Sequence, residues 1–473
     1  MSFLENTFKL AENGTCLRTE VLAGLTTFLT MAYIIFLQPA ILSGALYGKP
    51  TGMDFGAVMT GTCLAAALAT VIMALYARYP IALAPGMGEN FFFVFSAVPA
   101  AAAAGYGAAS WQVALGAVFI SGIIFMLISA AGFREALINA VSPSMKNGIA
   151  AGIGLFIAFI GLQNARVIIP NPGTAVQLNP EFSSPDVIIF LAGLVVTAAM
   201  QARRVRGAIL LGILTTSLLA IAVKHALPHL PEAVIKSAPV AKSLIMTHFV
   251  MAERIFAMPP SAAPVFMKMD LAGALSAAMA PFIIIFLFMA VFDTMGTLIG
   301  VAEQAGLMKD NKLPRAGRAL MADAIGTAAG ACLGNSTVVC YVESAAGIEQ
   351  GGRTGLTGLV AAALFLGALF FGPVIKMVGS YAPITAPALV IVGFMMIQNI
   401  RKLDWGDYTE AIPAFLTAIG IPLTYSVADG LAIGFIAYPC IKLVSGRGRE
   451  LKWPMALIAL ALLLYFILVR ERW

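Results

Sequence analysis

The stretch PFIIIFLFMAVFDTMGTLIG, residues 281–300, carries a single charged residue, Asp293, within an otherwise apolar run. Residues 334–347, GNSTVVCYVESAAG, place Glu343 in a second apolar run. A charged residue at the centre of a bilayer costs roughly 2.5–3.5 kcal/mol on insertion scales, so such residues face polar cavities, bind substrates or carry protons. Two carboxylates of this kind, each beside small and hydroxylic residues, indicate a transport site in a membrane protein.

The composition of the chain agrees with a membrane protein. Of 473 residues, 60% are hydrophobic and 11% are charged, against roughly 25% charged in soluble domains. We expect no cleaved signal in residues 1–18, because this stretch is polar and lacks a short apolar region followed by a cleavage site. The net charge of +6 is interpreted as membrane topology, so no nucleic acid partner is expected.

The cysteines and short motifs give no sign of an enzyme or a metal centre. The five cysteines form no CxxC pair, which argues against a disulfide framework or a zinc site. They are Cys16, Cys63, Cys332, Cys340 and Cys440. No phosphate-binding loop, metal motif or Ser/His/Asp arrangement stands out. We therefore expect a protein that is not an enzyme and needs no metal or cofactor.

Fourteen apolar segments are candidates for membrane spans, each of which needs about 20 mostly apolar residues. They are residues 22–46, 54–77, 84–97, 109–131, 143–163, 186–202, 206–224, 270–299, 314–331, 335–347, 354–375, 384–400, 409–426 and 428–445. A fifteenth hydrophobic run, 453–469, either spans the membrane or lies along its interface. The pattern predicts an all-α polytopic membrane protein with 14 transmembrane segments.

The third and tenth segments are short and begin alike, with Pro or Gly and polar residues: LAPGMGENFFF (83–93) and LGNSTVVCYVESAAG (333–347). Interrupted segments at corresponding places in two halves indicate a binding site. A weaker echo, GLQN (161–164) and MIQN (396–399), ends the fifth segment of each half. Seven spans per half is an odd number, so we expect a 7+7 inverted repeat.

The distribution of Lys and Arg sets the expected orientation, because cytoplasmic loops carry the excess of positive charge. With the N-terminus in the cytoplasm, most loop Lys and Arg residues fall inside, among them Arg203, Arg204, Arg401 and Lys402. The Pro- and His-containing connection 225–269 then joins the halves outside. We expect a multi-pass protein of the cell (inner) membrane.

Four motifs resemble those of the NCS2 nucleobase–cation symporters, and most closely their AzgA-like branch of adenine/guanine/hypoxanthine permeases. They are RTEVLAGLTTFLTMAYIIFLQPAIL (18–42), APGMGENFFF (84–93), FDTMGTLIGVAEQAGL (292–307) and GNSTVVCYVESAAGIEQGGRTGLTGL (334–359). The resemblance extends from about residue 18 to residue 445 and implies proton-coupled purine uptake by an elevator-like motion.

The resemblance also implies a domain organisation. Segments 1–4 (residues 1–131) and 8–11 (270–378) form a core domain, and segments 5–7 (132–269) and 12–14 (379–473) form a gate domain. Short strands in segments 3 and 10 meet at the substrate. Members of the family are typically homodimers in the lipid membrane that carry a purine together with protons.

Candidate site residues follow from matching the motifs. Asp293 and Glu343 match the family's acidic positions, and each is expected to bind purine N–H groups or to couple protons. Asp323 matches an acidic position that supports the core, with a smaller prospect of direct proton coupling. Asn90 matches the asparagine of segment 3, which either contacts the purine or caps the following helix.

Other candidates are weighed against ordinary packing. Gly88 allows close approach of the backbone, and Phe91 is positioned to stack on a purine or to pack in the core. Ser336 and Thr337 bind either the ligand or the backbone. Glu89 departs from the usual leucine of the branch, and Asn335 stands where Thr or Ser is expected. Both departures leave open which purine is preferred.

Three alternatives remain open. A transporter of the same fold could carry uracil or xanthine. It could instead carry anions, as sulfate permeases do, but an anion site needs positive charge or helix N-termini rather than two carboxylates. An intramembrane aspartyl protease using Asp293 and Asp323 is less favoured, because no GxGD string lies near either residue.

Overall fold

The computed structural model describes residues 5, 7–47, 50–131, 141–304, 313–452, 455–456, 459–460 and 462–463, with backbone alone at 47, 292, 296, 299, 300 and 302–304. The first helices are α2 (Leu17–Met31), α3 (Ile34–Leu42), α4 (Phe55–Ile72), α5 (Met87–Phe92), α6 (Val98–Ala101), α7 (Ser110–Ala131), α9 (Pro143–Asn164), α10 (Pro185–Ala202), α11 (Ala208–Ala226), α12 (Glu232–Ile235), α13 (Ala238–Ala241) and α14 (Leu244–Thr247). The later helices are α15 (Leu271–Ala274), α16 (Ala280–Gln304), α17 (Ala316–Cys332), α18 (Ser344–Glu349), α19 (Gly355–Ala368), α20 (Gly372–Ser380), α21 (Ala382–Ile397), α22 (Tyr408–Thr424) and α23 (Val427–Val444).

The strands are short and few among these residues: β1 (Leu83–Pro85), β2 (Ile168–Asn171), β3 (Ala175–Leu178) and β4 (Val338–Cys340). Single-turn 3-10 or π segments extend or join several helices. They are η1 (Ala45–Tyr47), η2 (Met73–Ala77), η3 (Phe93–Ala97), η4 (Ala102–Tyr106), η5 (Gly107–Ala109), η6 (Leu227–His229), η7 (Leu369–Phe371), η8 (Gln398–Lys402) and η9 (Gly448–Glu450).

Within the described residues, nine helical stretches are long and apolar enough to cross a membrane. The chain is therefore a multi-pass membrane protein. The expected segments 84–97 and 109–131 lie in one helical stretch, Met87–Ala131. The expected segment 270–299 is interrupted, since α15 ends at Ala274 and α16 begins at Ala280. The terminal run 453–469 falls mostly outside the described residues, so its path stays open, and the count of 14 spans stays a prediction.

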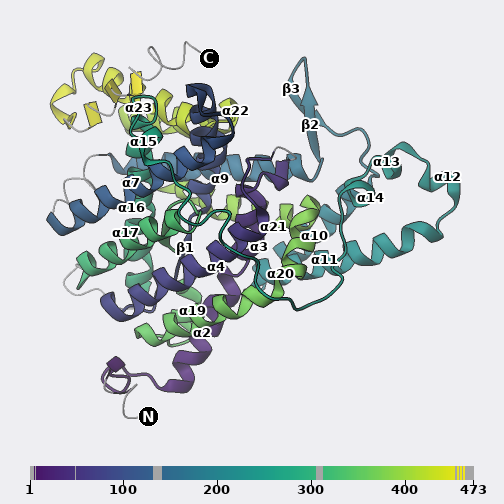
Figure 1. The fold of residues 1–473 in the computed structure, drawn as a ribbon. Helices are drawn as coiled ribbons and strands as arrows, with labels where there is room; N and C mark the ends of the chain where they lie inside the picture. The colour runs from purple at the N-terminus through teal and green to yellow at the C-terminus, as the bar shows by residue number, and fades with distance from the viewer. Residues whose placement is uncertain are drawn as a thin grey trace.

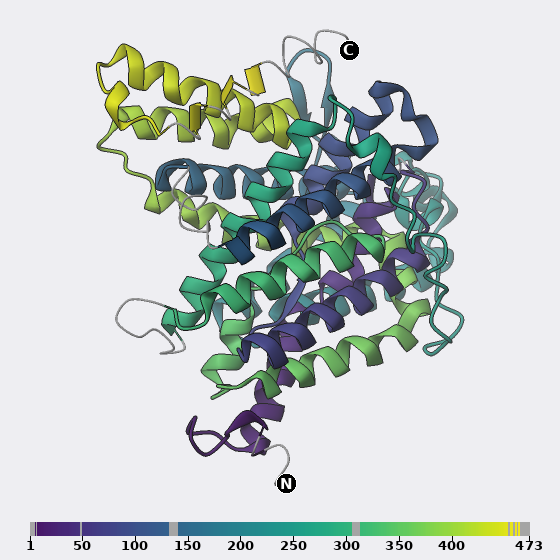
Figure 2. The same ribbon diagram turned by 60° about the vertical axis from the view of Figure 1, so that its left-hand side comes forward.

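The long helices pack in two groups that are each formed from both halves of the chain. In the first helix group, α2, α3, α4, α7, α16, α17, α18 and α19 contact one another. In the second helix group, α9, α10, α11, α21, α22 and α23 do the same. Several helices of the first group lie side by side as a layer, and α22 and α23 stand to one side of it (Figures 1 and 2).

Strands β1 and β4 form an antiparallel pair inside the first helix group, with Leu83 opposite Cys340 and Pro85 opposite Val338. An isolated pair of strands leaves backbone groups on both outer edges, which need partners when water is excluded. The hydroxyl of Thr70 donates to the carbonyl of Leu83 over 3.1 Å, and that of Thr327 donates to the carbonyl of Val338 over 2.9 Å. Hydroxyls at equivalent places on α4 and α17 thus donate hydrogen bonds to the backbone carbonyl of the first residue of each strand.

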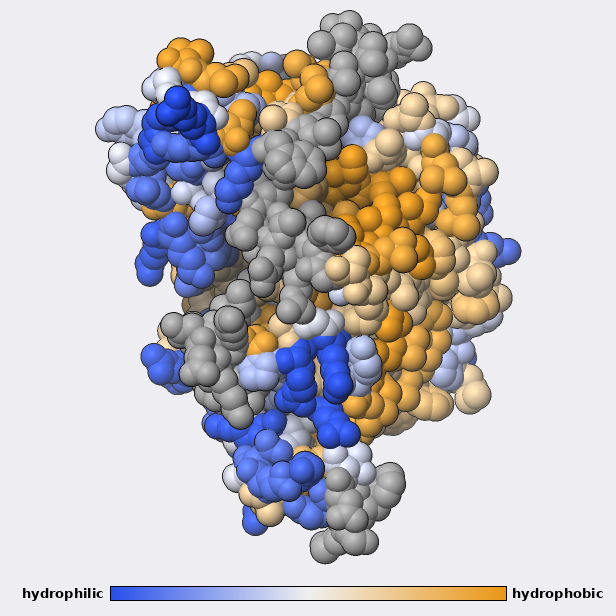
Figure 3. All heavy atoms as spheres, turned by 90° about the vertical axis from the view of Figure 1, so that its left-hand side faces the viewer, coloured by the Kyte–Doolittle hydropathy of each residue, from blue (hydrophilic) through white to orange (hydrophobic). Residues whose placement is uncertain are grey.

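The connection between α14 and α15 crosses one end of the first helix group. Its backbone N–H groups at Ala257, Met267 and Asp270 donate to carbonyls of Phe370, Cys332 and Gln112. The hydroxyl of Thr60 also donates to the carbonyl of Pro260 over 2.8 Å. Figure 3 shows a broad apolar surface beside hydrophilic clusters, as expected for helices that face lipid between two polar ends.

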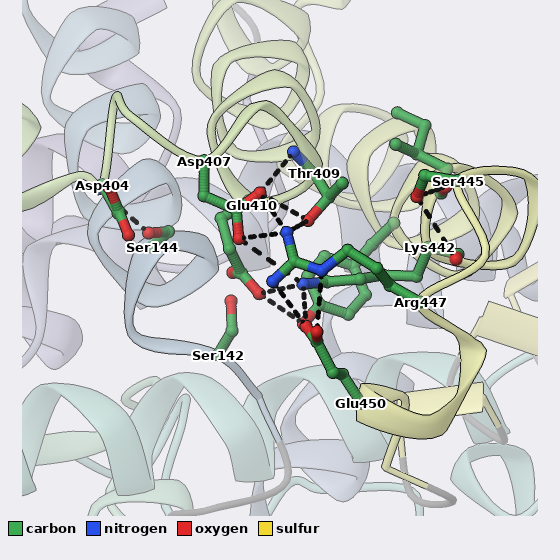
Figure 4. A network of polar contacts seen from close by, with 12 residues as sticks. Ser142, Ser144, Asp404, Asp407, Thr409, Glu410, Lys442, Ser445, Arg447 and Glu450 are labelled. Carbon is green, nitrogen blue, oxygen red and sulfur yellow. Dashed lines mark hydrogen bonds and ion pairs between the residues drawn. The ribbon is translucent and has the colours of Figure 1, made fainter.

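A network of charged side chains joins the beginning of α22 to the end of α23 and to the η9 turn that follows it (Figure 4). Lys442 is only 1% exposed and lies 2.8 Å from Glu450 and 3.1 Å from Glu410. Arg447 binds Asp407 at 2.8 Å and Glu450 at 2.7 Å. A buried ammonium group needs paired charges to offset its desolvation. The network therefore fixes the ends of these helices together.

Candidate functional site

A cavity of about 1520 Å³ is lined by residues of both helix groups. From the first group and its loops it is lined by Gly88, Glu89, Phe288, Met289, Asp293 and Val342, among others. From the second group it is lined by Ile149, Ile153, Leu194, Ile391, Phe394 and Phe435, among others. A mostly apolar cavity with a few convergent polar groups is the usual form of a site for a small molecule.

The polar part of the wall in the first helix group is acidic. Asp293 on α16 is exposed to the cavity, and Glu89 on α5 lines the same cavity while remaining 2% exposed. Gly88 lies between the two groups, since a Cβ there would be 3.2 Å from Cγ2 of Ile153 on α9. Of the ion pairs among the described residues, none includes either carboxylate. Asp293 is therefore able to accept hydrogen bonds from a ligand, whereas the carboxyl group of Glu89 is buried beside the cavity.

Asp323 lies behind this wall rather than on it. It is fully buried on α17, and its Oδ1 accepts a hydrogen bond of 2.8 Å from the hydroxyl of Thr294. Thr294 directly follows Asp293 on α16, so the bond fixes α16 to α17 beside the cavity carboxylate. This position suits the supporting role that the sequence favours for Asp323.

Glu343 lies between β4 and α18, next to the cavity residue Val342. It is partly buried, and its Oε1 accepts a hydrogen bond of 2.7 Å from the hydroxyl of Tyr33, which lies in the break between α2 and α3. Its backbone carbonyl also accepts from the hydroxyl of Thr30 over 3.3 Å. The structure thus holds Glu343 close to the cavity but does not place it among the residues that line it.

Asn90 and Ser336 belong to a buried network away from the cavity wall. The amide of Asn90 donates to Oε1 of Gln38, and the hydroxyl of Ser336 donates to Oδ1 of Asn90. Gln38 in turn donates to Oδ1 of Asn335 over 3.2 Å, and the hydroxyl of Thr62 donates to the same oxygen over 3.0 Å. In this conformation the amide of Asn90 is engaged by protein rather than offered to a ligand.

Phe91 and Thr337 are also fully buried. The ring of Phe91 lies 6.0 Å from that of Phe156 and 6.1 Å from that of Phe95, measured between centroids, so it packs in an aromatic cluster. The hydroxyl of Thr337 has no hydrogen-bond partner, whereas its carbonyl accepts from the backbone N–H of Gly86 over 2.9 Å. Neither side chain lines the cavity. The ring of Phe91 and the backbone of Thr337 link the elements that support its wall.

One end of the cavity is polar and basic. It is lined there by Lys146, Asn147, Gln398, Arg401 and Lys402, and Leu462 of the terminal run also contributes. These residues come from the beginning of α9 and from the end of α21 with η8. The cavity therefore extends from the acidic wall to the end of the molecule where the basic loop residues lie.

The described part of the chain contains no group of three or more His, Cys, Asp or Glu residues that could hold a metal ion. All five cysteines are free. The chemistry that the site offers is that of two carboxylates on an otherwise apolar wall, which accept hydrogen bonds and exchange protons. Such a wall suits a small planar molecule that carries several N–H groups.

These observations define a polytopic membrane transporter with a central cavity between two helix groups. The model of the family Xan_ur_permease, described as the permease family, matches residues 18–469. The chain belongs to this permease family, the NCS2 family that its motifs resemble.

Three curated relatives cover the chain almost completely. The chain is 47% identical to a putative permease of Methanocaldococcus jannaschii, over 99% of each chain. It is 43% identical to the guanine/hypoxanthine permease PbuG of Bacillus subtilis, over 98% of this chain and 99% of the relative. It is 39% identical to the adenine permease AdeP of Escherichia coli, over 98% and 96%. These relatives are transporters, which agrees with the expectation that the chain is not an enzyme.

Solved structures show the same fold at low identity. The transmembrane domain of the cyanobacterial bicarbonate transporter BicA matches with a TM-score of 0.61 and 14% identity, over 88% of this chain and 97% of that domain. The murine anion transporter Slc26a9 matches with a TM-score of 0.61 and 11% identity, over 94% and 72%. At such identities the likeness concerns the fold alone.

Three residues that line the cavity or hold its neighbouring residues in place were not predicted from the sequence. Glu89 was treated as a departure that bears on purine preference but not as a residue of the site, although a carboxylate in an apolar run is the same signal that identified Asp293. Tyr33 lies just before α3 and Gln38 lies within it, both in an apolar stretch. An uncharged polar residue in such a stretch is a weaker sign of a functional role than a carboxylate. The apolar lining from α9 and α21 carries no signal at all, because such residues look like ordinary helix packing.

Proposed function

We propose that the chain takes up purine nucleobases together with protons across the cell (inner) membrane. The observation that carries the proposal is Asp293, an unpaired carboxylate exposed on the wall of a cavity between the two helix groups. The names of the relatives support the substrate class, because they include guanine/hypoxanthine and adenine permeases. The acidic wall disfavours an anion as substrate.

Proton coupling follows from the chemistry of the carboxylates. A purine N–H favours the ionised form of a carboxylate that accepts its hydrogen bond, whereas burial favours the protonated form. A proton taken up outside by Asp293 or Glu343 therefore neutralises the wall during transfer, and the proton and the purine are both released inside. Asp323 shapes this step through Thr294 without contacting the purine.

The two helix groups correspond to a core and a gate domain in this proposal. The first helix group contains the residues from segments 1–4 and 8–11, and the second contains those from segments 5–7 and 12–14. The matching bonds of Thr70 to β1 and Thr327 to β4, both in the second segment of a half, support a 7+7 inverted repeat. The core slides against the gate, and the cavity opens to each side in turn.

The basic end of the cavity supports an assignment of the side to which the cavity opens. Lys146, Arg401 and Lys402 lie at that end, and Lys and Arg accumulate on the cytoplasmic side. The cavity is thus open to the cytoplasm, with the N-terminus on the same side, and the conformation is inward-facing. Assembly as a homodimer in lipid remains an expectation from the family.

The test is uptake of labelled adenine, guanine and hypoxanthine into cells that lack their own purine permeases, with and without a proton uncoupler. We expect uncoupler-sensitive uptake of at least one purine. Asp293→Asn and Glu343→Gln should each lower uptake about 10- to 100-fold, because hydrogen bonds to charged groups contribute about 1.5–3 kcal/mol. Glu232→Gln, at an exposed position on the short helix α12, is the matched control. No uptake of any purine, with the protein present in the membrane, would overturn the proposal.

The sliding motion has its own test at Gly88 and Ile153. A Cβ at residue 88 would lie 3.2 Å from Cγ2 of Ile153, so two cysteines there fall within reach of a disulfide. In a background free of other cysteines, oxidation of Gly88→Cys with Ile153→Cys should lock the core against the gate and stop uptake until a reductant is added. Undiminished uptake with the crosslink formed would contradict an elevator-like motion.

A further inference from the structure

Glu89 is a buried carboxylate that the transport cycle described above does not use. It is 2% exposed, it lines the central cavity, and its Oε2 has no hydrogen-bond partner. The carboxyl group folds back over Gly86, where a Cβ would lie 2.1 Å from Oε2. Only glycine at residue 86 leaves this space, so the local backbone accommodates the carboxyl group on the cavity wall.

A buried carboxylate oxygen without a partner is costly in a protein interior. Burial of a polar group without a compensating hydrogen bond disfavours the folded state, and native proteins leave few such groups. No ion pair among the described residues includes Glu89. Asp293 lines the same cavity and adds a second negative charge rather than a donor. A donor on a molecule that enters the cavity would satisfy this oxygen after a small movement of the side chain.

We propose that Glu89 determines which purine is carried by accepting hydrogen bonds from the pyrimidine edge of guanine. This inference rests on the proposed purine transport. Guanine presents two adjacent donors, N1–H and the N2 amino group, which match the two oxygens of a carboxylate. Hypoxanthine presents N1–H alone. Adenine presents its N6 amino group beside the lone pair of N1, which faces a carboxylate oxygen unfavourably.

In this proposal the two acidic residues bind different parts of the purine. Asp293 lies on α16 and Glu89 on α5, so they contact a ligand in the cavity from different elements. Asp293 accepts from one part of the purine, and Glu89 accepts from the pyrimidine edge. A site with buried hydrogen-bond acceptors discriminates strongly against substrate analogues that lack the matching donor groups. When such an analogue binds, the acceptors are left without a hydrogen bond.

The experiment measures kcat/KM for uptake of guanine, hypoxanthine and adenine by the wild type and by Glu89→Gln. We expect the wild type to prefer guanine over hypoxanthine and hypoxanthine over adenine. In Glu89→Gln the ratio of guanine to adenine should fall about tenfold or more. The glutamine amide opposes the guanine donors with its own NH2 group but pairs well with adenine. Glu232→Gln, the same change at an exposed position, should leave the ratio unaltered.

The outcomes separate the two proposals. A wild type that carries purines but favours adenine as much as guanine would overturn the role of Glu89 and leave the proposed transport standing. So would an unchanged ratio in Glu89→Gln. A wild type that carries no purine would overturn the proposed function itself. If Glu89→Gln fails to reach the membrane, thermal stabilisation of the purified wild type by each purine decides, and guanine must stabilise it most.

Discussion

The hydroxyl of Thr294 lies 2.8 Å from Oδ1 of Asp323, so the residue that follows the cavity carboxylate Asp293 is fixed to the neighbouring helix. Both side chains are fully buried. The bond joins α16 to α17 at the level of the acidic wall. It therefore sets the position of Asp293 without any contact between Asp323 and the cavity.

Thr294→Val should destabilise the protein and weaken transport together. The variant keeps the shape of the side chain but removes the hydroxyl that donates to a buried carboxyl group, which costs about 1–3 kcal/mol. We expect a lower melting temperature in detergent and a reduced kcat for uptake. Thr215→Val, whose hydroxyl bonds only to the carbonyl of Gly212 within its own helix, is the control. Equal effects of the two substitutions would argue against the positioning role.

Tyr33→Phe should reduce uptake about tenfold, because it removes the hydrogen bond of 2.7 Å that holds Glu343 beside the cavity. The matched control is Tyr438→Phe, which removes an equally short bond from a tyrosine to Glu410 at the end of the second helix group. Uptake per folded molecule should stay near the wild-type level in the control. Full activity of Tyr33→Phe would show that Glu343 needs no such anchor.

Two glycines of α19 should respond oppositely to alanine. A Cβ at Gly355 would lie 2.0 Å from the backbone oxygen of Ala74, so Gly355→Ala forces two helices apart and should destabilise by more than about 1–3 kcal/mol. A Cβ at Gly367 meets nothing within 4 Å, and Gly367→Ala should gain about 0.5–1 kcal/mol from helix propensity. Thermal unfolding in detergent measures both. A stabilising effect at residue 355 would contradict the close packing of α19 against η2.

The charged network at the ends of α22 and α23 predicts a pH dependence of stability. Hydrogen bonds from Thr409, with help from Arg447 and Lys442, lower the pKa of Asp407 from 3.8 to about 2. Because the folded pKa lies below the unfolded one, Asp407 contributes stability above about pH 4. That contribution, about 1–2 kcal/mol, is lost as the pH falls from 4 through 2.

Asp407→Asn should therefore lower the melting temperature at pH 6, and the difference from the wild type should shrink as the pH approaches 2. Thermal scans in detergent across this range provide the measurement. Asp404→Asn is the control on the same loop, because this exposed carboxylate accepts only from the backbone N–H of Gly406. A difference that persists unchanged at low pH would exclude the ionised form of Asp407 as its source.

The sequence was sufficient for the class of protein and for a small set of candidate residues, of which Gly88 and Asp293 line the cavity. Long apolar runs and the rare carboxylates within them are local properties, since lipid excludes charge wherever it stands in the chain. This reasoning identified Asp293, and the motifs identified the family. It also identified Asn90 and Ser336, but without their shared network, because the spacing of residues along a chain does not show which partner each one meets.

Only the tertiary structure decided which polar groups face the cavity and which form hydrogen bonds within the protein that support the cavity wall. Glu89 and Asn90 are neighbours in sequence, yet one lines the cavity and the other is bound to Gln38 and Ser336. Likewise Tyr33 meets Glu343 although 310 residues separate them. Hydropathy determines that a segment enters the membrane. The directions of individual side chains depend on contacts between distant segments, and these exist only once the helices have packed.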